Sequence, residues 1–223
     1  MQTTTMKPIV YALIAFTLAW SSPAVQADSL LSFHGVYGIS DIDGISLIDE
    51  SLPVDRPRDD PQSVTGLGLE LSHQFGEMPI RLGLEYTYRF RYDVDIFSVE
   101  SNPRLFRVDV ETHSLHLNGY YDIDLDSDWQ AIVGGGIGYV LHRLDTESLR
   151  GSVNPSVSNS ENDLGWNLTL GLRKALNERW NFDLRYRYSD LGSFETGVSS
   201  LGGVEVDDYF SHDILIGFSY DLP

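Results

Sequence analysis

The sequence contains no cysteine and few basic residues, and each shortage excludes a class of protein. Without cysteine, the chain forms no disulfide scaffold and offers no thiolate to a metal ion or to nucleophilic catalysis. Because 15 Lys and Arg residues face 33 Asp and Glu residues, the formal net charge is −18, which argues against nucleic-acid binding. Hydrophobic residues make up 42% and aromatic residues 12% of the 223 positions, which argues against disorder.

Long apolar runs are missing beyond the N-terminus, and the slightly negative mean hydropathy excludes a polytopic helical membrane protein. The one such run extends from Ile9 to Trp20, preceded by Lys7 and followed by the small-residue segment Val25-Gln26-Ala27. This order is typical of a secretory signal peptide, and the run is too short to span a bilayer. We expect residues 1–27 to be cleaved and residues 28–223 to form one mature domain; an uncleaved anchor helix is the alternative.

The rest of the chain alternates between apolar and polar residues, as in a β-strand with one apolar and one polar face. The clearest case is residues 80–92, where Ile, Leu, Leu, Tyr, Tyr, Phe and Tyr alternate with Arg, Gly, Glu, Thr, Arg and Arg. The pattern predicts eight strands, at about residues 32–42, 63–75, 80–92, 110–123, 129–141, 164–175, 180–190 and 209–222.

The expected connections alternate between short and long. The short ones lie near residues 76–79, 124–128 and 176–179, and the long ones near 43–62, 93–109, 142–163 and 191–208. Outer-membrane barrels combine an even number of antiparallel strands with short periplasmic turns and longer extracellular loops. We therefore predict an all-β fold, an eight-stranded antiparallel up-and-down transmembrane β-barrel with short periplasmic turns and four long extracellular loops.

Alternation also fits a soluble lipocalin-like barrel, whose apolar face points inward. Side-chain volume decides between the two, because the interior of an eight-stranded barrel is only just wide enough for side chains to fill. The apolar faces carry bulky residues such as Trp166, Phe182 and Phe218, whereas the polar faces are rich in glycine. We therefore expect the apolar faces to contact lipid. The predicted aromatic belts are Trp129, Trp180, Phe75 and Tyr220 at the periplasmic rim and Tyr88, Phe90, Tyr92 and Tyr188 at the outer rim.

The last predicted strand resembles the signal that the outer-membrane barrel-assembly machinery reads. Gly217, Tyr220 and Leu222 have the spacing of that signal, whereas Leu215 and the terminal Pro223 depart from it. The resemblance implies that the assembly machinery is a partner of this chain.

Three segments resemble the opacity-type surface antigens, small outer-membrane barrels related in shape to the OmpA and OmpX class. They are Leu117-Asn118-Gly119-Tyr120-Tyr121-Asp122, the glycine-rich segment 133–139, and residues 186–192 followed by Ser211-His212-Asp213. The resemblance covers most of residues 30–222 and implies an eight-stranded barrel in the outer membrane of a Gram-negative bacterium. It implies little about activity, since the loops of this family vary most.

Charged residues on the polar faces have to be paired or solvated, because an isolated buried ion is costly. Counted from the short turns, Glu70, Glu85 and Arg185 lie at similar heights. We therefore expect Arg185 to reach across the lumen to Glu70 or Glu85, with Arg81 and Arg89 on either side.

A second ion pair is expected between Arg187 and Asp213 on neighbouring strands, with His116 near them. This network is predicted to plug the lumen; a narrow pore for small solutes or ions is the alternative. The complete predicted network is Glu70, Arg81, Glu85, Arg89, Asp183, Arg185, Arg187, Asp213 and His116.

The chain offers little that indicates an enzyme or a metal site. Ser114 and His116 share one face, but strand geometry separates them by about 7 Å, and their order is the reverse of a His-x-Ser deacylase motif. Residues 122–128 carry alternating carboxylates without the glycine and glutamate of an EF-hand loop. We expect no catalytic residue, no cofactor and no metal; a lipid-A-modifying enzyme is a distant alternative.

Acidic residues concentrate in the expected long connections, for example Glu205, Asp207 and Asp208. An acidic rim repels lipopolysaccharide phosphates unless divalent cations bridge them, and it suits a basic protein partner. The sequence therefore predicts a surface barrel that acts in envelope integrity or adhesion through its loops. The expected partners are outer-membrane lipids, lipopolysaccharide and a host or cell-surface protein, but not nucleic acid.

Overall fold

The computed structural model describes residues 29–48, 54–55, 62–98, 104–126, 128–149, 156–198 and 202–223. The predicted signal peptide, residues 1–27, lies outside these ranges, so its cleavage stays a prediction. Within these ranges no helix is both long and apolar enough to cross a membrane.

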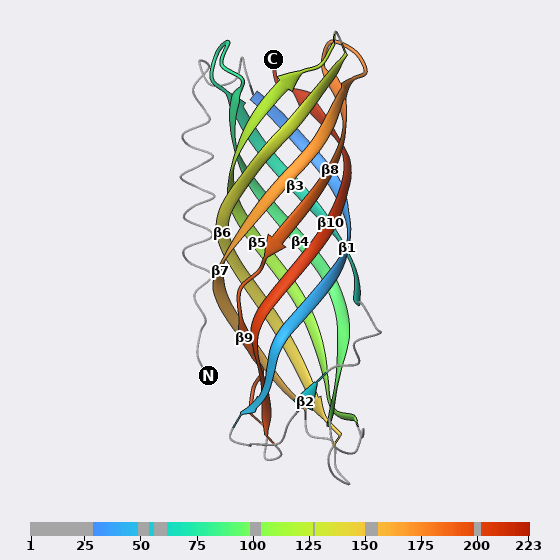
Figure 1. The fold of residues 1–223 in the computed structure, drawn as a ribbon, viewed down its shortest axis with the longest axis vertical. Helices are drawn as coiled ribbons and strands as arrows, with labels where there is room; N and C mark the ends of the chain where they lie inside the picture. The colour runs from blue at the N-terminus through green and yellow to red at the C-terminus, as the bar shows by residue number, and fades with distance from the viewer. Residues whose placement is uncertain are drawn as a thin grey trace.

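The described residues form one closed antiparallel sheet, as predicted. Its main strands form the ring β1-β3-β4-β5-β6-β7-β8-β10, and β10 pairs back to β1. Figure 1 shows these strands tilted around a tall barrel, with the C-terminus at one end and β2 near the other. The strands are β1 (Ser29–Ile48), β2 (Val54–Asp55), β3 (Gln62–Gln74), β4 (Ile80–Ser98), β5 (Arg104–Asp124), β6 (Trp129–Ser148), β7 (Ser156–Ala175), β8 (Trp180–Asp190), β9 (Phe194–Glu195) and β10 (Gly203–Asp221).

Most strands are far longer than a membrane requires. The strand β5 has 21 residues and β6 and β7 have 20 each, whereas about 9–11 residues cross an outer membrane. Much of the sequence predicted as long connections therefore belongs to strands, including residues 104–109, 142–148 and 156–163. The barrel continues well beyond the bilayer on the side of the long loops.

The interior and the exterior of the barrel exchange polarity along its length. In β5, the inward side chain His116 is 2% exposed and the outward Leu117 is 54% exposed, whereas farther along Val108 points inward and Asp109 outward. Lipid therefore surrounds one part of the barrel and water surrounds the other. The large exposed apolar side chains of the main strands mark the membrane-spanning segments, and they fall within residues 31–39, 67–75, 80–90, 113–123, 129–141, 164–172, 180–188 and 210–220.

A β-bulge in β4 produces part of this exchange. The register between β4 and β5 shifts between Arg89 and Tyr92, and beyond the shift Val94 and Ile96 are buried inside the barrel. Tyr92 consequently packs inward against Tyr209, with 6.5 Å between the ring centroids. Its predicted place in the outer aromatic belt was wrong, because one extra residue reverses the face of every residue after it.

The part of the barrel beyond the membrane encloses an apolar cluster, which we call the outer core. It closes around a break between β8 and β9, where Gly192 adopts a φ of 79° and Leu191 and Phe194 turn inward. Asp163 supports the break by accepting hydrogen bonds from the backbone N–H and the hydroxyl of Ser193, at 2.9 and 2.8 Å. The outer core consists of Ile42, Leu47, Val94, Ile96, Leu105, Phe106, Val108, Val110, Val140, Leu144, Leu191, Phe194, Val204, Val206 and Tyr209.

Candidate functional site

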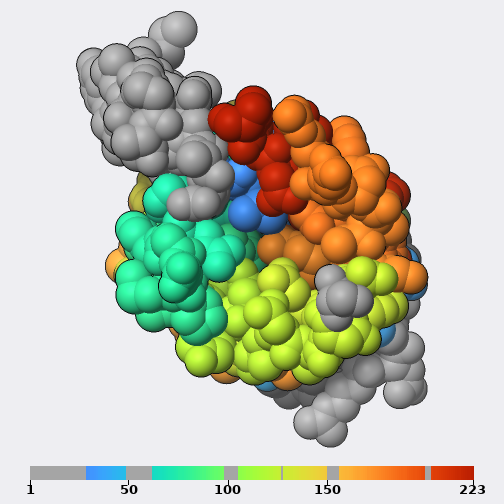
Figure 2. All heavy atoms as spheres, turned by 90° about the horizontal axis from the view of Figure 1, so that it is seen from above, coloured from blue at the N-terminus to red at the C-terminus, as the bar shows by residue number. Residues whose placement is uncertain are grey.

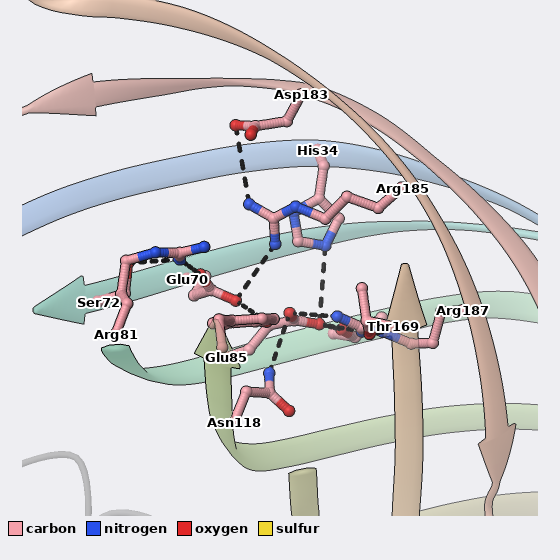
Figure 3. Close-up of polar contacts among 12 residues, drawn as sticks. His34, Glu70, Ser72, Arg81, Glu85, Asn118, Thr169, Asp183, Arg185 and Arg187 are labelled. Carbon is pink, nitrogen blue, oxygen red and sulfur yellow. Dashed lines mark hydrogen bonds and ion pairs between the residues drawn. The ribbon is translucent and has the colours of Figure 1, made fainter. Parts of the chain in front are cut away.

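Charged side chains fill the lumen within the membrane. Figure 3 shows a large part of this lumen network, in which side chains from several strands converge. Every residue predicted for the network points inward and is at most 3% exposed. The structure therefore brings the predicted residues into one interior, although not with all of the expected partners.

Glu70 on β3 accepts hydrogen bonds from two arginines. The guanidinium of Arg81 donates to Glu70 Oε1 at 3.1 Å, and that of Arg185 donates to Oε2 at 3.4 Å. The hydroxyl of Tyr120 also donates to Oε2, at 2.5 Å, and the guanidinium of Arg81 lies 4.3 Å from the centroid of the Tyr120 ring. Arg81 also donates from Nη1 to the hydroxyl of Ser72 at 3.1 Å, from Nε to Asp122 Oδ2 at 2.8 Å and from Nη2 to Asp122 Oδ1 at 3.1 Å.

Arg187 pairs with Glu85 and not with Asp213, so the second predicted ion pair was wrong. Arg187 Nη1 donates to Glu85 Oε1, and Nη2 donates to Oε2 at 2.7 Å. Asp213 instead accepts from Arg89. Arg187 and Asp213 are cross-strand neighbours on β8 and β10. Their side chains extend into the lumen side by side, so the end of the longer arginine lies beyond the aspartate. A side chain as long as arginine ends on the far wall of a narrow lumen, where β4 presents Glu85.

Three further ionisable residues, which were not predicted for the network, belong to it. Asp122 pairs with Arg81 as described, Arg173 Nε donates to Asp183 Oδ1 at 2.8 Å, and His34 Nε2 lies 3.7 Å from Glu85 Oε1. Asp122 and Arg173 lie in predicted strands at inward positions, so strand parity carried a signal for both.

The formal charges of the lumen network cancel. Pairing of this kind offsets the cost of removing ions from water. The five arginines are Arg81, Arg89, Arg173, Arg185 and Arg187, and the five carboxylates are Glu70, Glu85, Asp122, Asp183 and Asp213.

His116 is buried in the same interior without a hydrogen bond. Both of its ring nitrogens lack a partner, and so does the hydroxyl of Ser114. The serine and the histidine that share this face therefore make no nucleophile–base contact.

His142 joins the lumen network to the outer core. Its Nε2 lies 3.0 Å from the carbonyl oxygen of Leu191, and its Nδ1 lies 3.1 Å from the hydroxyl of Thr112. Burial lowers the pKa of His142 to about 4, so the imidazole is neutral at pH 7. A neutral ring donates from Nε2 to the carbonyl and accepts from Thr112 at Nδ1. Along the barrel axis, the lumen therefore contains ion-paired side chains within the membrane, then His142, and then the apolar side chains of the outer core.

The outer aromatic belt includes two histidines in addition to the predicted Tyr88 and Tyr188. His113 stacks on Tyr88 with 4.8 Å between ring centroids, and the His212 ring lies 5.1 Å from that of Tyr188 at a tilt of 60°. Each imidazole also has its Nδ1 2.7 Å from a second tyrosine hydroxyl, that of Tyr86 or Tyr186.

Beyond this belt, β4, β5 and β6 present a charged face to the outside. Asp93, Asp109 and Asp145 lie directly opposite one another on the three strands. Arg91 Nη1 lies 2.9 Å from Asp145 and 3.8 Å from Asp109, which relieves part of their repulsion. Burial, with repulsion from Asp93 and Asp145, raises the pKa of Asp109. The charged face consists of Arg91, Asp93, Asp95, Arg107, Asp109, Glu111, Arg143, Asp145 and Glu147.

Comparison with known proteins identifies the family. Residues 12–221 match the model of the outer membrane protein beta-barrel domain. The chain belongs to this family. It is a β-barrel protein of the bacterial outer membrane, as its sequence predicts.

Relatives of this outer-membrane barrel cover nearly its whole length. Outer membrane protein PagN of Salmonella typhimurium is 24% identical over an alignment of 234 positions, which covers 93% of this chain and 96% of PagN. The solved structure of OprG from Pseudomonas aeruginosa has a TM-score of 0.54 at 21% identity and covers 87% of this chain and 96% of OprG. Neisserial surface protein A has a TM-score of 0.50 at 13% identity, covering 87% and 97% of the two chains. The two solved structures show a shared fold.

Proposed function

We propose that this protein is a closed outer-membrane barrel that carries a rigid charged face above the bilayer and binds partner molecules there. The observation that carries the proposal is the polarity exchange along the barrel. It combines an ion-paired interior within the membrane with an apolar interior beyond it. The apolar interior stabilises the part of the barrel that extends beyond the membrane. Because side chains of the described strands fill the interior, they leave no room for a water-filled channel.

The filled lumen supports a structural role over a pore. The charges within the membrane are paired among themselves, and the bidentate contact between Arg187 and Glu85 joins opposite walls. Above them, Phe106 and Leu144 are at most 1% exposed. An ion that crossed the barrel would have to separate the pairs and then enter an apolar core, and both steps are costly.

The charged face supports a binding role. It carries six carboxylates and three arginines, so its formal charge is negative by three. Its strands are hydrogen-bonded neighbours with the outer core behind them, which holds the charges in fixed positions. Rigid, oriented charges favour a partner of complementary charge, here a protein surface rich in lysine and arginine. Adhesion through such a surface, together with support of the envelope, is the function we propose; catalysis is no part of it.

The binding role is tested with cells that display the protein and a fluorescent peptide rich in lysine and arginine. The variant Asp93→Asn/Asp145→Asn should weaken peptide binding by about two- to fivefold, with a smaller salt dependence. The control Asp43→Asn/Asp208→Asn removes the same charge from β1 and β10, elsewhere on the ring, and should bind like the wild type. Equal losses in both variants would mean that net charge alone attracts the peptide.

The closed lumen is tested by conductance in planar lipid bilayers. The reconstituted wild-type protein should give no stepwise current. Regular current steps that disappear in a variant with a blocked lumen would instead favour the pore.

A further inference from the structure

The end of the barrel that carries the short turns contains a cavity in its mouth. Figure 2 looks onto this end, where the short turns and the C-terminal residues surround the opening. The cavity has a volume of about 220 Å³. Because this end faces the periplasm, the cavity is separate from the charged face on the outside. Its charged lining consists of Arg173 and four carboxylates, Asp124, Asp126, Asp128 and Asp221, together with the amides of Gln74, Gln130 and Asn181.

Arg173 supplies a buried cation to this cavity. Its side chain lines the cavity but is only 4% exposed, and its Nε donates to Asp183 Oδ1 at 2.8 Å. Its Nη2 is buried and has no hydrogen-bond partner. A buried donor without an acceptor costs free energy, and the cost is greater for a charged group. A carboxylate that enters the cavity can supply the missing acceptor.

Four carboxylates line the cavity and favour a cationic group, and two of them, Asp124 and Asp221, each accept from a side-chain amide of the lining. Asp124 Oδ1 accepts from the side-chain amide of Gln130 at 2.8 Å, and Asp221 Oδ2 accepts from that of Asn181 at 3.1 Å. A carboxylate offers about four acceptor positions, so each retains capacity for an ammonium group. Among the residues that the structure describes, no group of three or more histidines and carboxylates could hold a metal ion. Organic cations are therefore the better match.

We propose that this cavity binds the zwitterion of an α-amino acid, with its carboxylate at Arg173 and its ammonium group at Asp124 and Asp221. The volume supports a ligand of this size. It exceeds the roughly 30 Å³ of one water molecule several times, and it is smaller than the about 300–1,000 Å³ of pockets for drug-sized ligands. The lining comes from strands on several sides of the ring, which fixes both charges before the ligand enters.

The proposal is tested by titration calorimetry with the full-length barrel in detergent micelles. The probes are L-lysine and glycine, compared with propionate, which lacks the amine, and propylamine, which lacks the carboxylate. The amino acids should bind at least about tenfold more tightly than either half-probe, because each half leaves one charged contact unmade. Equal binding of glycine and propylamine, or no binding of any probe at 10 mM, would overturn the proposal.

Variants locate the ligand within the cavity. Asp124→Asn/Asp221→Asn should weaken glycine binding at least about tenfold and leave the affinity for propionate unchanged. Glu178→Gln removes an acidic residue of a neighbouring turn that does not line the cavity, and it should bind glycine like the wild type. The variant Arg173→Gln should lose propionate binding. Because Arg173 also pairs with Asp183, the folding of this variant is verified by comparing its heat-resistant migration in gels with that of the wild type. Unchanged glycine binding in the double variant would place the ligand elsewhere and refute the site.

Discussion

Removal of one partner from the Arg187–Glu85 pair provides the most direct test of the closed lumen. Glu85 is 0% exposed, and both of its oxygens accept from Arg187, with further donors in Thr87 and Asn118. In Glu85→Gln, the guanidinium remains buried and loses its counter-charge. In Arg187→Met, the carboxylate loses its two strongest donors but keeps the two weaker ones.

Each single substitution should destabilise the barrel by about 3–5 kcal/mol, the usual effect of leaving one partner of a buried ion pair alone. The double variant Glu85→Gln/Arg187→Met leaves no unpaired ion at this pair and should cost less than the sum of the two, with a coupling of about 1–3 kcal/mol. The free energy of unfolding is measured by urea titration in lipid vesicles, with tryptophan fluorescence as the readout.

An exposed ion pair provides the control. Arg91 is 52% exposed where it approaches Asp145, so Arg91→Met should cost only about 0–1 kcal/mol. Losses for Glu85→Gln and Arg187→Met as small as this, with no coupling between them, would refute the reasoning. That result would mean that water solvates these charges and that the lumen is wet.

Three further predictions concern the outer part of the barrel. The pKa of His142 falls from 6.5 in the unfolded chain to about 4 in the folded protein, so only the unfolded chain gains a proton between these values. The free energy of unfolding should therefore fall by about 3 kcal/mol as the pH drops from 6.5 to 4. The fall should be smaller in His142→Gln, and urea titrations at each pH measure both. Gly192→Ala should cost about 1–2 kcal/mol, because φ is 79° and the added Cβ meets the Asp163 side chain at 2.7 Å; an unchanged midpoint would contradict this. Phe106→Ala should cost about 3–5 kcal/mol by leaving a cavity, since Phe106 is 0% exposed, without loss of the protein from isolated outer membranes.

Local periodicity was sufficient to predict the barrel and the inward position of its charges. Residues 80–90 alternate so regularly that their lipid-facing side follows from the sequence alone. The partners of Arg187 did not follow, because they depend on the stagger of the closed ring and on which wall a long side chain reaches. These are properties of the whole barrel and leave no trace in a single strand.

The outer core was missed for a different reason. Phe106 and Val108 face inward at the same alternate positions as His116. The alternation continues along β5, but the inward residues change from polar to apolar and the outward residues from apolar to charged. When one polarity is assigned to each face of a strand, this change resembles the end of the strand. In β4 the bulge at Arg89–Tyr92 has the opposite effect: apolar residues stay at even positions through Val94 and Ile96, but after the bulge these positions face inward instead of outward.

The band of outward charges above the aromatic belt also determines how deeply the protein sits in the membrane. A displacement toward the periplasm by two residues along the strands would bring Glu111 and Arg143 to the edge of the hydrocarbon, where a lipid-facing charge costs up to about 1 kcal/mol, and a larger displacement would cost more. A displacement in the other direction would expose Leu117 and its apolar neighbours to water. The barrel therefore has one preferred immersion depth. The length of its strands beyond the aromatic belt then fixes how far its outer end extends above the membrane.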